Sequence, residues 1–159
     1  MPEETLRRVV RLARFDGLTV LALPGFFALL AASAGDVTGV IVGLLIAAAG
    51  AIELHGVDLL RAGEARGMSW LVTSQFYLMT VVVIFCLWQL QHEDLHLLRT
   101  ALTDEMRTTI AQANMSEDAF LQLTYRITYR VITLVTLFYQ GGMGLYYFRR
   151  RETVRQALQ

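Results

Sequence analysis

Long apolar stretches separated by short polar segments are the main pattern of this chain. Four of them approach the ~20 apolar residues that a helix needs to cross roughly 30 Å of hydrocarbon. They run from Leu18 to Ser33, Val37 to Ala51, Trp70 to Leu90 and Val131 to Phe148. We therefore predict an all-α fold, a bundle of four transmembrane helices over about 17–34, 37–58, 69–90 and 131–148.

Two further segments show helical periodicity outside these spans. Residues 2–15 carry apolar side chains on one face and arginines on the other, which predicts an N-terminal amphipathic helix that lies at the membrane surface. Residues 91–130 have apolar positions at helical spacing on both sides of a turn at Asn114–Ser116, with Ser116 as an N-cap. We expect 91–130 to form a helical hairpin outside the membrane that extends the third and fourth spans.

The composition agrees with a membrane protein. The chain has 159 residues, of which 55% are hydrophobic and 18% are charged, whereas a soluble domain has about a quarter charged residues. This leaves room for a single integral membrane domain over 1–159, with 149–159 as a tail. The only cysteine, Cys86, lies inside the third span, so no disulfide can hold the 91–130 segment.

The arginines predict the orientation. All 14 positive side chains are arginine, and ten of them precede the first span, lie between the second and third, or follow the fourth. By the positive-inside rule these segments face the cytoplasm. We therefore expect a multi-pass protein of the bacterial inner membrane with both termini in the cytoplasm.

The second span carries a face of small residues. Gly39, Gly43, Ala47 and Gly50 follow one another at the spacing that lets two helix backbones approach closely. Either another span of the same chain or a second copy of the chain can occupy this face. Self-association is therefore expected through this face or through the apolar seam of the 91–130 hairpin.

Polar side chains inside the spans are the candidate functional residues, because each needs a partner or a purpose in lipid. Glu53 lies on the glycine face with no evident partner in its own helix. In one account these residues hydrogen-bond between helices, and in the other they line an aqueous path. The candidates for the path are Glu53, Ser74, Gln75, Tyr129, Thr133, Thr136 and Gln140.

One segment outside the spans suggests metal chemistry. Residues 92–96 read His-Glu-Asp-Leu-His, which on a helix places two imidazoles on one face beside a carboxylate. This resembles the zincin metalloprotease motif over five residues, and the resemblance implies His92 and His96 as zinc ligands and Glu93 as the general base. Asp94 stands where that family usually has an uncharged residue, and no third-ligand motif follows. Zinc at His92 and His96 is the one cofactor that the sequence suggests.

Three functions are compatible with these patterns. The first is a homo-oligomeric channel or transporter-like conduit for ions or small solutes. The second is a non-catalytic accessory or scaffold subunit of a larger membrane complex, and the third is a membrane metalloenzyme that uses the 92–96 segment. We expect the chain not to be an enzyme, and we expect membrane lipids and membrane proteins, not nucleic acid, as its partners.

Overall fold

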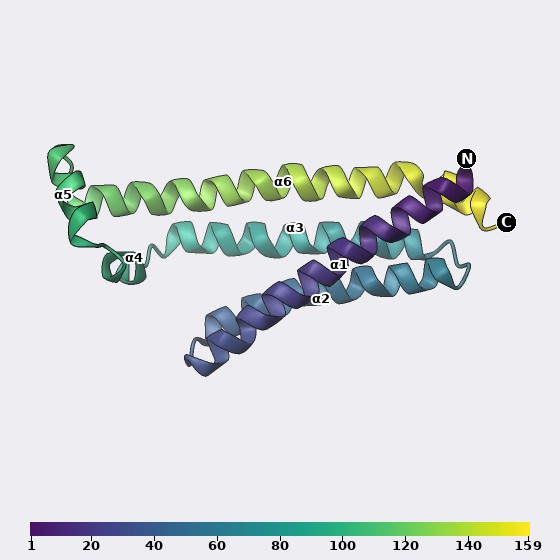
Figure 1. Cartoon of the computed structure of the whole chain (residues 1–159), viewed down its shortest axis with the longest axis horizontal. Helices are drawn as coiled ribbons and strands as arrows, with labels where there is room; N and C mark the ends of the chain where they lie inside the picture. The colour runs from purple at the N-terminus through teal and green to yellow at the C-terminus, as the bar shows by residue number, and fades with distance from the viewer. The chain divides into compact units, whose positions relative to one another are not determined.

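The computed structural model describes the backbone of all 159 residues and every side chain except that of Leu97. The described residues form helices and no strand, so the predicted all-helical fold is confirmed. Figure 1 labels the six helices, which are α1 (Pro2–Ser33), α2 (Val37–Arg61), α3 (Gly67–Gln91), α4 (His96–Thr100), α5 (Asp104–Gln112) and α6 (Glu117–Ala157).

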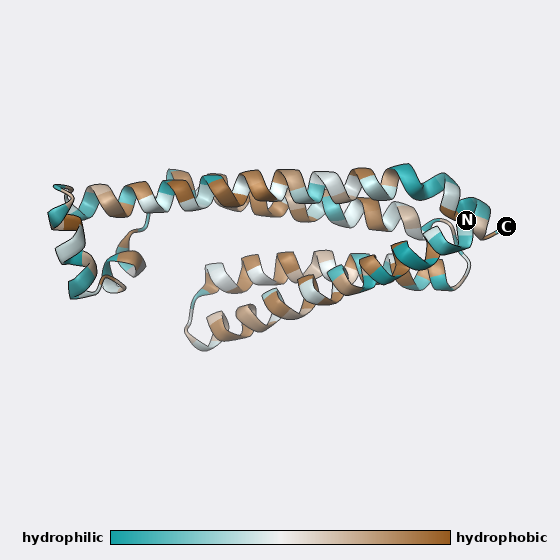
Figure 2. Ribbon diagram, turned by 45° about the horizontal axis from the view of Figure 1, so that its top comes forward, coloured by the Kyte–Doolittle hydropathy of each residue, from teal (hydrophilic) through white to brown (hydrophobic). Residues whose placement is uncertain are grey.

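Four of the helices, α1, α2, α3 and α6, are long and apolar enough to cross a membrane. Only 17–28% of the most apolar window of each helix is buried inside the chain. Large apolar side chains are therefore exposed on the outside of these helices. The ribbon in Figure 2 is coloured as hydrophobic along much of their length. Lipid tails can solvate such a surface at no cost, whereas water cannot. The fold fits a membrane protein.

The chain forms two compact units. Residues 1–82 and 136–159 make up the first unit, and residues 83–135 make up the second. Helices α3 and α6 each contribute one part to both units. The single membrane domain expected from the sequence stays a prediction.

The turn between α1 and α2 follows from its residues. Gly35 has a φ of 72°, a backbone conformation that glycine adopts without strain. The Asp36 carboxylate then accepts a hydrogen bond of 2.9 Å from the backbone N–H of Gly39 and so caps the start of α2. The two helices run side by side from this turn (Figure 1).

The small residues of the second span contact α1 of the same chain. A Cβ atom added at Gly50 would lie 2.5 Å from the backbone nitrogen of Leu21 and 2.6 Å from the carbonyl oxygen of Gly17. One added at Gly43 would lie 2.8 Å from the Cβ of Ala28. Since α1 occupies this face, a second copy could reach it only by displacing α1.

The N-terminal amphipathic segment is not a separate helix. Helix α1 continues without a break from Pro2 to Ser33, so residues 2–15 are its first half. Val9 and Ala13 are completely buried in a cluster with Leu60, Leu71, Tyr147 and Val154. The expected helix lying flat on the surface is therefore not confirmed, because its apolar face packs into the core of the first unit.

The predicted hairpin over 91–130 is correct on one side only. Helix α6 begins at Glu117, directly after the predicted cap: the Ser116 hydroxyl accepts a hydrogen bond from the Ala119 N–H, and Asn114 has the positive φ of a turn. On the other side α3 ends at Gln91 and two short helices follow. The side chains of Asp94 and Thr103 accept bonds from the backbone N–H groups of His96 and Met106, which starts new helices there and prevents one continuous helix.

Candidate functional site

Four long helices of the first unit each bring a polar side chain to one buried position. The Gln75 amide nitrogen on α3 donates hydrogen bonds to Glu53 on α2, at 3.1 Å, and to Asp16 on α1, at 3.3 Å. The Tyr147 hydroxyl on α6 donates to the same oxygen of Glu53 at 3.0 Å. The Tyr139 hydroxyl, also on α6, donates to the other oxygen of Asp16 at 3.3 Å. We call these five residues the carboxylate cluster.

The close approach of α1 and α2 makes the cluster possible. Gly17 follows Asp16 in the chain, and a Cβ atom added at Gly17 would lie 3.3 Å from the Cβ of Glu53. Larger residues at Gly17 or Gly50 would hold the two helices apart. The glycines therefore set the distance at which one amide group can bridge the two carboxylates.

The two carboxylates of the cluster are buried without a cation. Asp16 is 8% exposed and Glu53 is 2% exposed. Among the described side chains, neither takes part in an ion pair with an arginine. Two negative charges beside each other in an apolar region are costly unless hydrogen bonds, a proton or a cation compensates them.

Two amide oxygens in the first unit lack partners. Gln75 uses its nitrogen for both carboxylates, and its own oxygen Oε1 is buried and accepts no hydrogen bond from the described residues. The Oε1 atom of Gln140 on α6 is buried and unpaired in the same way. A buried acceptor of this kind costs about 1–3 kcal/mol unless a ligand, ion or water satisfies it.

The cluster lies towards the end of the first unit where the arginines of 7–14, 61–66 and 149–155 are found, which we call the arginine-rich end. Glu53 precedes Arg61 by eight residues, or about 12 Å along α2. Asp16 lies two residues after Arg14, and Tyr147 lies two residues before Arg149. The cluster is therefore nearer to the arginine-rich end of the four helices than to their opposite end.

The structure brings together part of the predicted polar set. Glu53 and Gln75 are bonded to each other, and Gln140 is buried in the same unit. Ser74 is buried but donates to the carbonyl oxygen of Leu71 in its own helix. Thr136 is half-buried in the first unit, with no interaction that assigns it to the cluster.

Two of the candidates for the aqueous path lie in the part of α6 that belongs to the second unit. Tyr129 accepts a hydrogen bond of 3.0 Å from Gln89, and Thr133 donates to the backbone oxygen of Tyr129. The first bond joins two helices and the second lies within one helix, as expected if these side chains have a structural role. Neither bond supports the alternative in which Tyr129 and Thr133 line an aqueous path.

Three members of the cluster, Asp16, Tyr139 and Tyr147, are not among the residues that the sequence pattern predicts for the path. Asp16 stands where the arginine-bearing segment meets the first span, just before the predicted span over 17–34, so its position in the sequence does not mark it as a buried carboxylate. Tyr147 is seven residues after Gln140, which places both on one face of α6, and this spacing could have revealed it. Tyr139 is half exposed and shows no comparable signal.

The 92–96 segment does not have the geometry that the zinc motif requires. Residues 92–95 are not helical, so the two imidazoles are not placed on one helix face. The His92 ring bonds to the Trp88 carbonyl oxygen and stacks on the Trp88 ring, and Glu93 forms an ion pair with Arg126 at 2.5 Å. Among the described residues no group of three or more potential metal-ligating side chains is found.

Comparison of the chain with protein-family models, with curated proteins and with solved structures finds no match. The geometry of the carboxylate cluster is therefore the basis for assigning a function to this chain.

The hydroxyl of Tyr147 can be tested without changing the shape of the side chain. Tyr147→Phe removes the donor to Glu53 and leaves a buried carboxylate oxygen with one bond fewer, so we expect a loss of about 1.5–3 kcal/mol in the free energy of unfolding. Tyr146→Phe, at a neighbouring half-buried ring whose hydroxyl makes no hydrogen bond among the described residues, is the control and should change stability little. Unfolding of the purified chain in mixed detergent micelles measures both, and equal effects would contradict the assigned bond.

Proposed function

We propose that this chain is a membrane protein that takes up a small cation, a proton or a monovalent metal ion, at the carboxylate cluster and passes it across the membrane. The observation that supports the proposal is the pairing of Asp16 with Glu53. Both are buried, both accept from one Gln75 amide group, and neither has a cationic partner among the described side chains. An ionisable residue inside a span is by default a candidate for an ion or proton path.

The chemistry of the cluster fits a cation that is bound and released. Carboxylate and amide oxygens are the ligands that hard cations prefer, and a proton on either carboxyl would remove the repulsion between the two. The buried, unpaired oxygen of Gln75 adds an acceptor that a metal ion or a water could use. Tyr139 reaches Asp16 and is half exposed, which connects the cluster to the outer surface of α6.

Transport across the whole membrane needs more than this one cluster, because the cluster lies near the arginine-rich end. The proposal therefore includes association of several copies, whose exposed apolar helix surfaces would pack together and complete the conduit. An accessory subunit that carries no ion is the competing function, and the exposed surfaces alone fit it equally well.

A flux measurement tests the proposal. Purified chain in liposomes with an internal pH dye is compared with protein-free liposomes under an imposed potassium diffusion potential, with sodium present or absent. We expect faster internal pH change or sodium uptake in the liposomes that contain the protein, and the dependence on sodium identifies the cation. Folded, reconstituted protein that gives the same rates as empty liposomes would overturn the proposal and favour the accessory subunit.

A further inference from the structure

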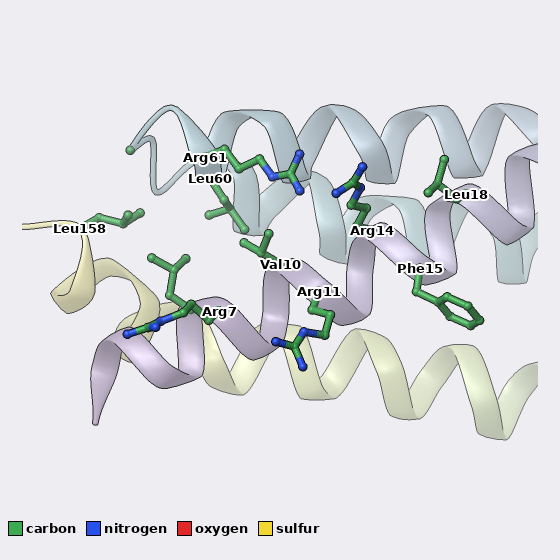
Figure 3. A pocket seen from close by; sticks show the side chains of 11 residues that line it. Arg7, Val10, Arg11, Arg14, Phe15, Leu18, Leu60, Arg61 and Leu158 are labelled. Atoms are coloured by element: carbon green, nitrogen blue, oxygen red, sulfur yellow. The ribbon is translucent and has the colours of Figure 1, made fainter.

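A groove of about 670 Å³ lies between α1 and α2 at the arginine-rich end of the first unit. The residues that line it come from the first half of α1, from the end of α2 with Gly63 after it, and from Leu158 after the end of α6 (Figure 3). Their side chains are of two chemical kinds, those of arginine and large apolar ones. The lining includes Val10, Arg11, Arg14, Phe15, Leu18 and Arg61.

Three of the four arginines that line the groove have no acidic partner among the described side chains, whereas the fourth, Arg7, pairs with Glu3 at 3.7 Å. Arg11, Arg14 and Arg61 form no ion pair with a described side chain, and no aspartate or glutamate lines the groove. Figure 3 shows Arg14 of α1 and Arg61 of α2 extending into the space between the two helices. Guanidinium groups placed in this way fit an anion with several oxygen atoms, and a phosphate above all.

Apolar side chains continue the groove along α1 towards the span. Arg14 and Leu18 are four residues apart, so they share a face of the helix, and Figure 3 shows both on the side of α1 that faces α2. Phe15 and Leu18 belong to this lining, and the rest of the chain covers little of them, with exposed fractions of 73% and 47%. A ligand that contacts both kinds of side chain must have an anionic end and an apolar end.

We propose that this groove binds one anionic phospholipid. Its phosphate lies between Arg14 and Arg61, and an acyl chain follows Phe15 and Leu18 along the surface of α1. The arginines precede the apolar run that begins at Leu18, and this is the level at which lipid headgroups meet a span. A free phosphate shares the headgroup chemistry but would use neither the apolar lining nor most of the volume. This inference does not depend on the carboxylate cluster.

Native mass spectrometry of the detergent-purified chain tests the site, with phosphatidylglycerol as the anionic probe and phosphatidylcholine as the zwitterionic one. We expect one phosphatidylglycerol bound per chain in preference to phosphatidylcholine. Each arginine near a headgroup contributes about 1 kcal/mol, so Arg14→Gln with Arg61→Gln should weaken binding roughly 20- to 30-fold. The matched control, Arg151→Gln with Arg155→Gln, removes the same charge at the same end of the chain but lies outside the groove, and it should change binding little.

A second variant separates the two sources of phosphate. Phe15→Ala shortens the apolar lining and should weaken phosphatidylglycerol binding while every arginine stays in place. Inorganic phosphate at millimolar concentration should compete poorly with the lipid. Equal loss in the groove pair and the control pair, no preference for the anionic lipid, or effective competition by inorganic phosphate with no effect of Phe15→Ala would each overturn the proposal.

Discussion

Glu53→Gln should reduce cation flux through the reconstituted chain to the level of protein-free liposomes. The glutamine side chain has the size of glutamate and keeps an oxygen that can accept from Tyr147 and Gln75. It cannot carry a negative charge and cannot take up a proton, and it is a weaker cation ligand than a carboxylate. The variant therefore removes the chemistry of the cluster while it leaves the packing of α2 in place.

The control for this variant is Asp58→Asn, an exposed carboxylate five residues further along the same helix. It makes the same change in charge outside the cluster, and its flux should equal that of the wild type. A Glu53→Gln chain that folds, reconstitutes and keeps wild-type flux would show that the buried carboxylate does not carry the cation.

Gly50→Ala should destabilise the first unit by about 3 kcal/mol, at the upper end of the cost of overpacking a well-packed contact. The added methyl group would meet the backbone atoms of Leu21 and Gly17, at 2.5 Å and 2.6 Å, and not the end of a flexible side chain. Helix α1 must move away from α2 to make room. Because Glu53 lies one turn further along α2, the same shift should also weaken the contact between Gln75 and the two carboxylates.

Gly142→Ala is the matched control, since an added Cβ at this position of α6 has nothing within 4 Å. Here the replacement of glycine by alanine in a helix interior should stabilise the chain by up to about 1 kcal/mol. Unfolding in mixed micelles measures both variants. Effects of the same sign and size at Gly50 and Gly142 would contradict the close contact of α1 with α2.

The sequence predicts the spans well because few backbone structures are stable in the hydrocarbon region of a membrane. A helix that crosses hydrocarbon must satisfy every backbone group internally and must be apolar along its length, so the stretches from Val37 and Trp70 mark α2 and α3 directly. Glycine spacing on the second span indicates close packing for the same reason. Neither pattern tells which helix packs there, and the structure places α1 on that face.

The features that the sequence does not predict are the break in the helix after α3, the packing of residues 2–15 and the carboxylate cluster. Each depends on which of several local or distant contacts a residue makes. Residues 91–103 have helical periodicity, but the side chains of Asp94 and Thr103 bond to nearby backbone groups and start new helices. Residues 2–15 read as a surface helix, since periodicity does not show whether an apolar face meets lipid or a core. Asp16 becomes a candidate functional residue only because Gln75 on α3 bonds both to it and to Glu53 on α2, and this contact between helices cannot be predicted from the sequence around Asp16.

The most direct test of the central claim is infrared difference spectroscopy on the lipid-reconstituted chain, with buffers exchanged between high and low pH and with and without sodium. If the carboxylate cluster exchanges a cation or a proton inside the membrane, the wild type should show carboxyl bands that respond to the exchange. Asp16→Asn and Glu53→Gln should lose these bands, while Asp58→Asn keeps them. Identical difference spectra for the wild type and both cluster variants would contradict a role for Asp16 and Glu53 in cation exchange.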